Sequence, residues 1–233
     1  MMKAIITSVL SIILLSGCAK ESANAGLMQD YPVTDTVSYL ALGDSYTIGE
    51  SVPQKESLPF QLADNLRKQG ILVSDLKIIA QTGWTTGDLK NAIVSENITR
   101  KFDFVTVLIG VNNQYRGYSQ AMYRTEFIEL LNTAINFANG DPTKVFVISI
   151  PDWGATPFGG SGKNIDISTQ IDQFNLINKE ESLKLHVSYA DITPISRQVI
   201  NEPSLAAADG LHPSEKMYAL WLEQLVPKIR EAF

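Results

Sequence analysis

The stretch VSYLALGDS, residues 37–45, decides the fold of this chain and points to its chemistry. Its first six residues form a short continuous apolar run, which predicts a buried β-strand. The run ends in Gly43-Asp44-Ser45, so Ser45 is expected on a turn at the end of the strand with its backbone N–H free. The tripeptide alone has low specificity, because a turn serine more often caps a helix than acts as a nucleophile.

Short apolar runs alternate with longer amphipathic ones along the rest of the chain. Strands are predicted at residues 37–42, 76–80, 104–109, 145–150 and 187–190. Helices are predicted at residues 57–69, from 85 or 86 to about 97, at about 119–138, at 165–185 and after Pro213. This alternation predicts an α/β fold: a three-layer α/β/α sandwich with a five-stranded parallel, flavodoxin-like doubly wound sheet. Ligands of such sheets bind beyond the carboxyl ends of the strands.

Chemically useful residues follow several of these strands. Gly83 comes after the second predicted strand, where a glycine lets the backbone approach a ligand closely. Asn112 comes after the third strand and offers a side-chain amide donor. Asp209 and His212 lie just before the last helix and supply the acid and the imidazole that a serine needs to become a nucleophile. The sequence therefore predicts one crevice that collects a nucleophile, two donors and a base.

This ordered set resembles the SGNH hydrolases, also called the GDSL family of esterases and lipases. The resemblance implies that Ser45 is the nucleophile, His212 the general base and Asp209 the acid that orients it. It also implies an oxyanion hole made by the backbone N–H groups of Ser45 and Gly83 and the amide of Asn112. No cofactor and no metal ion is expected.

Several neighbouring residues are interpreted separately. We interpret Asp44 as a brace of the turn, Asp152 as a loop-turn residue and His186 as structural. Tyr46 follows Gly-Asp-Ser where the family commonly has a leucine, and Asn113 stands where it often has an aspartate. Four aromatic residues that follow strands either line the crevice or join the core: Trp84, Tyr115, Tyr118 and Trp153.

The N-terminal residues predict export and attachment to a membrane. Residues 1–17 have a short positive start and an apolar run too short for a membrane span, which is typical of a signal peptide. Leu15-Ser16-Gly17-Cys18 resembles a bacterial lipobox, so we expect lipid on Cys18, a polar tether over residues 18–36 and the hydrolase domain over residues 37–233. The alternative is an ordinary secretory signal with an incidental cysteine. The expected location is the bacterial cell envelope, on its periplasmic or cell-surface face.

Charge and composition limit the remaining function classes. The net charge is −6, or −7 once Lys3 is removed with the signal, and no basic cluster is present, so nucleic acid is not an expected partner. The expected partner is a small-molecule, lipid or glycan ester, and the sequence carries no signal for an oligomeric state. We predict a serine esterase that works through an acyl-enzyme, resembling lysophospholipases or short-chain esterases. The alternatives are a carbohydrate O-deacetylase, a non-catalytic module that binds acylated glycans or lipids, and an acyltransferase with the same triad.

Overall fold

The computed structural model describes residues 35–233, together with Met1. The predicted signal peptide, the lipidation site Cys18 and nearly all of the predicted tether lie outside the described residues. None of the helices between residues 35 and 233 is both long and apolar enough to cross a bilayer.

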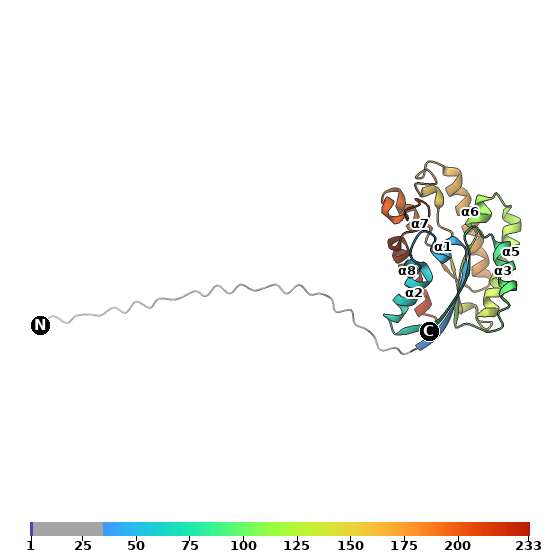
Figure 1. The fold of residues 1–233 in the computed structure, drawn as a ribbon, viewed down its shortest axis with the longest axis horizontal. Helices are drawn as coiled ribbons and strands as arrows, with labels where there is room; N and C mark the ends of the chain where they lie inside the picture. The colour runs from blue at the N-terminus through green and yellow to red at the C-terminus, as the bar shows by residue number, and fades with distance from the viewer. Residues whose placement is uncertain (2–34) are drawn as a thin grey trace.

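A five-stranded parallel sheet forms the middle layer of the domain (Figure 1). Its order is β2-β1-β3-β4-β5, which confirms the predicted flavodoxin-like doubly wound sheet. The central strands are buried on both faces, as expected for a parallel sheet covered by helices on both sides. The strands are β1 Asp35–Gly43, β2 Ile71–Ala80, β3 Phe104–Leu108, β4 Val145–Ile148 and β5 Ser188–Ala190.

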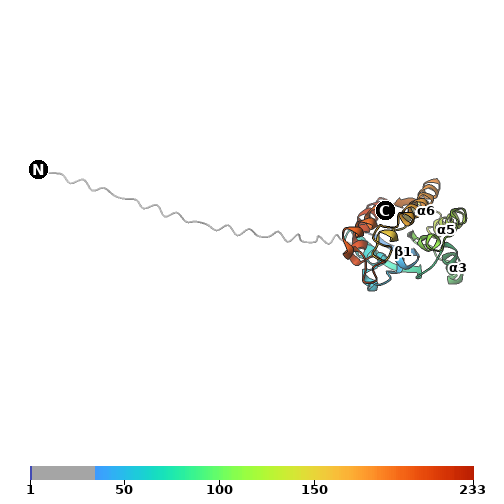
Figure 2. The ribbon, with the colours of Figure 1, turned by 90° about the horizontal axis from the view of Figure 1, so that it is seen from above.

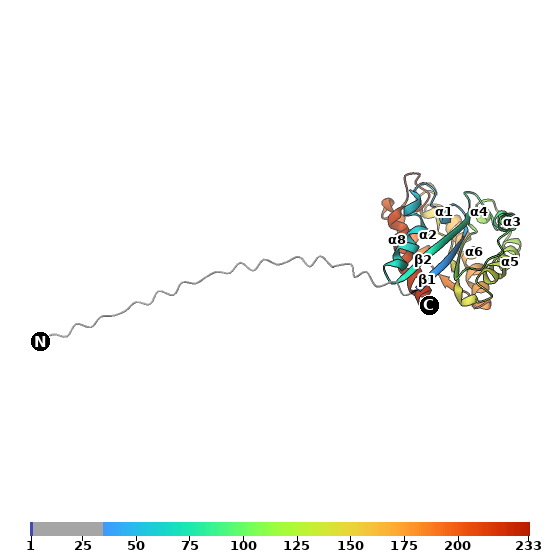
Figure 3. The ribbon, with the colours of Figure 1, turned by 60° about the horizontal axis from the view of Figure 1, so that its bottom comes forward.

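Two layers of helices cover the sheet, as Figures 1 to 3 show from three directions. One layer contains α2 (Leu58–Arg67) and α8 (Glu215–Arg230), which pack against each other. The other contains α3 (Thr86–Glu96), α5 (Gln120–Phe137) and α6 (Ile165–Lys184). The short elements are α1 Ser45–Ile48, α4 Val111–Tyr115, α7 Thr193–Ser196 and the 3-10 turns η1 Gln54–Glu56, η2 Pro142–Lys144, η3 Trp153–Ala155, η4 Arg197–Ile200 and η5 Pro203–Leu205.

Three of the long helices, α3, α5 and α8, begin at a polar residue whose side chain caps them. The Thr85 hydroxyl accepts a hydrogen bond from the backbone N–H of Asp88, and the Asp88 carboxylate accepts one from that of Thr85, so α3 starts with a complete capping box. The Ser214 side chain caps α8 by accepting a hydrogen bond from the backbone N–H of Met217. Both loops therefore end at fixed points beside the carboxyl edge of the sheet.

Two parts of the fold differ from the sequence prediction. Strand β2 begins at Ile71, five residues before the predicted start, because Ile71 pairs with Asp35 and the register shifts by one residue after Val37. Much of β2 is only half-buried, and Ser74 and Asp75 interrupt its apolar residues, so the strand shows no continuous apolar run from its start. Helices α1 and α4 were not predicted, since four and five residues are too few to show a helical period.

Candidate active site

Ser45 is the first residue of α1 and follows β1 after a single residue. Oδ1 of the Asp44 carboxyl group accepts a hydrogen bond of 3.0 Å from the backbone N–H of Tyr46, which caps α1 and confirms that Asp44 braces the turn. A Cβ atom on Gly43 would lie 2.0 Å from Thr47 Oγ1 and 2.4 Å from the carbonyl oxygen of Leu108, so only glycine fits there. Within the described part of the chain, no hydrogen bond engages the N–H of Ser45. The turn therefore presents a hydroxyl and a free backbone donor side by side.

The predicted acid and base meet this serine. His212 Nε2 lies 3.0 Å from Ser45 Oγ, and His212 Nδ1 lies 2.6 Å from Asp209 Oδ2. A carboxylate can only accept at that nitrogen, so Nδ1 carries the proton and Nε2 is left to accept from the hydroxyl. Ser45 and His212 are almost fully buried, at 4% and 8% exposure. The structure thus joins three residues that lie up to 167 positions apart.

Asp209 is held by four donors. Its Oδ1 accepts from the backbone N–H groups of Leu211 and His212, at 2.9 and 3.0 Å. Its Oδ2 accepts from His212 and, at 2.6 Å, from the hydroxyl of Ser51. Partial burial by itself would raise the pKa of Asp209, but these hydrogen bonds, with that from Ser51 foremost, hold it well below its usual range. Asp209 is therefore a fixed carboxylate beside the imidazole.

Gly83 and Asn112 follow β2 and β3, whose carboxyl ends lie on either side of the end of β1 that leads to Ser45. Gly83 has a φ of +84°, which a glycine adopts without strain, and no hydrogen bond in the described residues uses its N–H. The amide of Asn112 donates to the carbonyl oxygen of Trp84 at 3.0 Å, which fixes its plane and leaves its second N–H unassigned. Asn112 lines the cavity beside Ser45.

Asn113 has a different position from Asn112. It is fully buried, and its side chain accepts from the backbone N–H of Thr86 at 3.0 Å and donates to the Thr86 hydroxyl at 2.7 Å. These bonds tie α4 to the start of α3. Asn113, which stands where the family often has an aspartate, therefore has a structural contact in this chain.

Two charged residues that the sequence analysis did not select hold the loop around Gly83. Arg116 Nη2 donates to the carbonyl oxygen of Gly83 at 2.6 Å, and its Nη1 lies 3.5 Å from Asp88 Oδ2. Glu50 accepts a hydrogen bond from the hydroxyl of Thr82. No sequence motif contains these residues, because each contact joins two loops far apart in the chain.

A cavity of about 230 Å³ opens beside Ser45. Tyr115, Trp153 and Phe158 form an aromatic wall of it, with ring centroids 5.4 Å apart for the first pair and 6.2 Å for the second. Of the four aromatic residues considered from the sequence, Tyr115 and Trp153 line this cavity, and Trp84 and Tyr118 do not. Both Trp84 and Trp153 pack against the core. The cavity is lined by Ser45, Tyr46, Val111, Asn112, Tyr115, Trp153, Phe158, Leu211 and His212.

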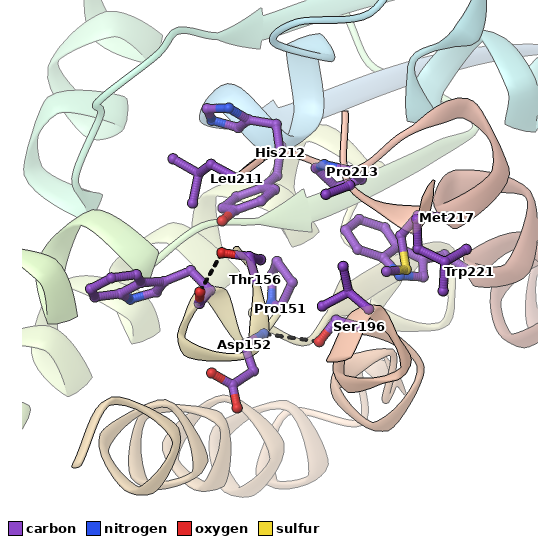
Figure 4. Close-up of a pocket in the computed structure, with 14 residues that line it drawn as sticks. Pro151, Asp152, Thr156, Ser196, Leu211, His212, Pro213, Met217 and Trp221 are labelled. Atoms are coloured by element: carbon purple, nitrogen blue, oxygen red, sulfur yellow. Dashed lines mark hydrogen bonds between the residues drawn. The ribbon is translucent and has the colours of Figure 1, made fainter. Parts of the chain in front are cut away.

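His212 also lines a second, much smaller cavity of about 20 Å³ (Figure 4). Figure 4 shows the carboxylate of Asp152 pointing away from His212. That carboxylate accepts from Gly154 N at 2.9 Å and forms an ion pair of 2.8 Å with Arg197. Asp152 therefore caps η3, as predicted for a loop-turn residue, and does not join the triad. His186 is exposed on the turn before β5, at the opposite edge of the sheet.

Comparison with known proteins places this site in a family. The family model described as the GDSL-like Lipase/Acylhydrolase family matches residues 41–220, which is most of the chain and contains Ser45, Gly83, Asn112, Asp209 and His212. The chain belongs to the GDSL-like lipase/acylhydrolase family. This GDSL-like chain is accordingly a serine hydrolase that acts on esters. A sequence search of curated proteins found no significant relative.

Solved structures share the fold of this GDSL-like domain at low sequence identity. Axe2, an acetylxylan esterase from Geobacillus stearothermophilus, is 17% identical over 85% of this chain and 96% of its own, with a TM-score of 0.65. A lipase/acylhydrolase from Enterococcus faecalis is 21% identical over 83% of this chain and 95% of its own, with a TM-score of 0.64. The psychrotrophic esterase EstA from Pseudoalteromonas sp. is 17% identical over 83% and 97%, with a TM-score of 0.62.

Proposed function

We propose that this GDSL-like hydrolase cleaves carboxylic esters through an acyl-enzyme on Ser45. The observation that carries the proposal is the unbroken chain of contacts from Ser45 Oγ to His212 Nε2, at 3.0 Å, and from His212 Nδ1 to Asp209 Oδ2, at 2.6 Å. This is the arrangement that turns a weakly nucleophilic hydroxyl into an activated one. The free N–H groups of Ser45 and Gly83 and the amide of Asn112 supply donors for the oxyanion.

In the first half of the reaction, Ser45 Oγ attacks the ester carbonyl carbon and its proton passes to His212 Nε2. The tetrahedral oxyanion is held by the three donors, and Asp209 stabilises the imidazolium. Collapse breaks the bond to the alcohol oxygen, which takes the proton from Nε2 and leaves. In the second half, water gives a proton to Nε2 and adds to the acyl-enzyme. The acid is then released, and the proton returns to Ser45.

We propose a short-chain ester or a lysophospholipid as the substrate class. The cavity of about 230 Å³ suits one short or folded acyl chain beside apolar rings. A second candidate is carbohydrate O-deacetylation, which is favoured by the exposed faces of Tyr115 and Phe158, at 60% and 58% exposure, because flat exposed rings suit stacking on a sugar. Axe2, with the same fold, is an acetylxylan esterase. We further propose that lipid on Cys18 anchors the enzyme in the cell envelope, as the lipobox-like sequence suggests.

Ser45→Ala tests the mechanism. With a short-chain aryl ester, the variant should lose turnover by at least about 10³-fold, whereas the exposed control Ser95→Ala should keep it. Covalent labelling by a fluorophosphonate probe should occur in the wild type and vanish in Ser45→Ala. Wild-type turnover by Ser45→Ala would refute the mechanism, and no labelling of folded wild type would favour a non-catalytic binding module.

A substrate panel separates the candidate classes. It consists of aryl esters of increasing acyl length, acetylated xylan and lysophosphatidylcholine, assayed with one enzyme preparation. Highest kcat/KM on acetylated xylan would replace the lipid or short-chain proposal by O-deacetylation. Acyl transfer to an added alcohol in preference to water would indicate a transferase.

A further inference from the structure

Ser51 has an unusual backbone conformation for its residue type. Its φ is +66°, in the left-handed region that a residue with a Cβ enters only at a cost. Four other non-glycine residues share a positive φ, and two of them are asparagines, which tolerate it better: Asn97, Asn139, Ser161 and His186. A strained residue of this kind persists only where its surroundings hold it.

The strained conformation places the Ser51 hydroxyl on the predicted catalytic acid. Ser51 Oγ donates to Asp209 Oδ2 at 2.6 Å, the length of a charge-assisted O–H···O⁻ bond. The same oxygen accepts from His212 Nδ1 at 2.6 Å. Ser51 lies 158 positions from Asp209 in the sequence but only six after Ser45.

The segment from Ser45 to Ser51 therefore contacts the C-terminal loop at two points. Ser45 Oγ lies 3.0 Å from His212 Nε2, and Ser51 Oγ reaches Asp209 at the other end of the acid–base pair. The contacts close a ring from Ser45 through His212 and Asp209 to Ser51 and back along the chain. Within this segment, the N–H groups of Gly49 and Glu50 donate to the carbonyl oxygen of Ser45, which keeps the turn compact.

We propose that Ser51 is a positioning residue that holds the Asp209 carboxylate toward His212 and shares its negative charge. The inference rests on the proposed triad function of Asp209 and His212. A second support is the environment of the carboxylate: the Ser51 hydrogen bond contributes most to the lowered pKa of Asp209, against the opposing effect of partial burial. Tyr46 packs on His212 with ring centroids 5.3 Å apart, and the charge of Asp209 acts on both Tyr46 and Tyr218. The other carboxyl groups that act on these two phenols are Asp44, Glu50 and Asp152.

Removal of the hydroxyl has an effect with a defined direction. Without Ser51, the charge of Asp209 is dispersed over one donor fewer, so the carboxylate stabilises a protonated imidazole on His212 more strongly. The acid limb of the pH profile of kcat/KM should then move to higher pH. Looser positioning of the pair should also lower kcat about tenfold, the lower end of the range for a hydrogen bond to a charged group. We expect the lower end because Ser51 is exposed, so that water can take the place of its hydroxyl. KM should change little.

Three substitutions separate the hydroxyl from the backbone. Ser51→Ala removes the hydroxyl and keeps the strain. Ser51→Gly removes the hydroxyl and relieves the strain, so it should fold at least as stably as the wild type. Ser51→Thr keeps a hydroxyl, so it should retain the pH profile with a lower melting temperature, because a β-branched residue is disfavoured at this φ. Ser161→Gly is the matched control, since Ser161 also has a positive φ, of 54°, and is exposed.

Activity and NMR together test the proposal. Ser51→Ala and Ser51→Gly should share the tenfold loss and the shifted acid limb, and both should move the downfield proton resonance of the His212 Nδ1–H. The chain has only two histidines, and His186 is exposed, so this resonance can be assigned. Ser161→Gly should alter neither readout.

Two results would overturn the proposal: wild-type kcat and pH profile in both Ser51→Ala and Ser51→Gly, or recovery of full activity in Ser51→Gly alone, which would reduce Ser51 to a backbone element. Failure of the proposed function looks different. If the proposed function fails, Ser45→Ala remains active. If only the Ser51 proposal fails, the wild type is active, Ser45→Ala is inactive and the Ser51 variants behave like the wild type.

Discussion

Asp44 gives the sharpest test of the electrostatics in this structure, through the pH dependence of stability. The residue is 1% exposed, and no group in the described residues forms a hydrogen bond with its Oδ2. Burial raises the pKa of Asp44 from 3.8 to about 7, although the hydrogen bond from the N–H of Tyr46 opposes the shift. Between those two pH values the folded protein keeps a proton on Asp44 that the unfolded chain has released. The free energy of unfolding must therefore fall as pH rises through this window.

The size of this effect follows from the shift. Raising the pKa of Asp44 from 3.8 to about 7 corresponds to about 4 kcal/mol of the free energy of unfolding, at about 1.4 kcal/mol per pKa unit. This stabilisation is fully lost once the pH exceeds about 7. Asp44→Asn removes the titration and keeps a side-chain oxygen that accepts from the N–H of Tyr46. Any loss of stability that the substitution causes equally at every pH cancels, because the experiment compares only how the stabilities of the variant and the wild type change with pH.

The assay is urea unfolding of the wild type and Asp44→Asn from pH 4 to pH 8. The stability of the variant relative to the wild type should rise by about 4 kcal/mol over this range. Asp141→Asn is the matched control, because Asp141 also accepts from the N–H two residues ahead, at 2.9 Å, but hydrogen bonds from Thr143 lower its pKa. Its difference from wild type should stay flat from pH 4 to pH 8. A flat difference for Asp44→Asn would refute the argument that burial keeps this carboxyl protonated.

The remaining predictions concern Asn112, its neighbour Asn113 and Arg116, which holds the loop around Gly83. Asn112→Ala should lower kcat by about 10²–10³-fold at unchanged stability, whereas Asn113→Ala should mainly lower the melting temperature, since it leaves the N–H of Thr86 without its buried acceptor. A steady-state assay with thermal melts of both variants checks this, and equal activity loss would contradict it. Arg116→Met should lower kcat about tenfold, because it removes the hydrogen bond to the carbonyl oxygen of Gly83. The control is Arg100→Met, which breaks an exposed ion pair with Asp75 and should leave kcat unchanged. An unchanged kcat in both variants would show that the Gly83 loop keeps its position without Arg116.

The sequence was sufficient to predict those parts of the structure that follow from periodicity and strand ends. The apolar run before Ser45 and the later runs predicted the five strands, and their parallel pairing placed Gly83 and Asn112 at one edge of the sheet. Asn112 and His212 both line the cavity beside Ser45. Cap residues such as Ser214 marked where the long helices begin. These features are local, so each is visible in a few neighbouring residues.

The contacts that refine the site could not be predicted in this way. Ser51, Glu50 and Arg116 are common residue types in loops, and nothing in their neighbours marks them. Their partners lie 158, 32 and 33 positions away, and the backbone angles that direct them are set by the whole loop arrangement. The aromatic wall was only half predicted for the same reason: Trp84 and Trp153 both follow strands, but only Trp153 faces the cavity.

The turn after α1 connects the two halves of the site. Glu50 accepts from Thr82 in the loop around Gly83, and the next residue, Ser51, donates to Asp209 in the loop that contains His212. Successive residues of one turn thus hold two loops that lie far apart in the sequence against the segment that bears Ser45. Reaction at Ser45 requires the oxyanion donors and the imidazole to be placed relative to each other as well as to the serine. The two hydrogen bonds of this turn link both loops to the segment of Ser45, and the positive φ of Ser51 belongs to the same arrangement.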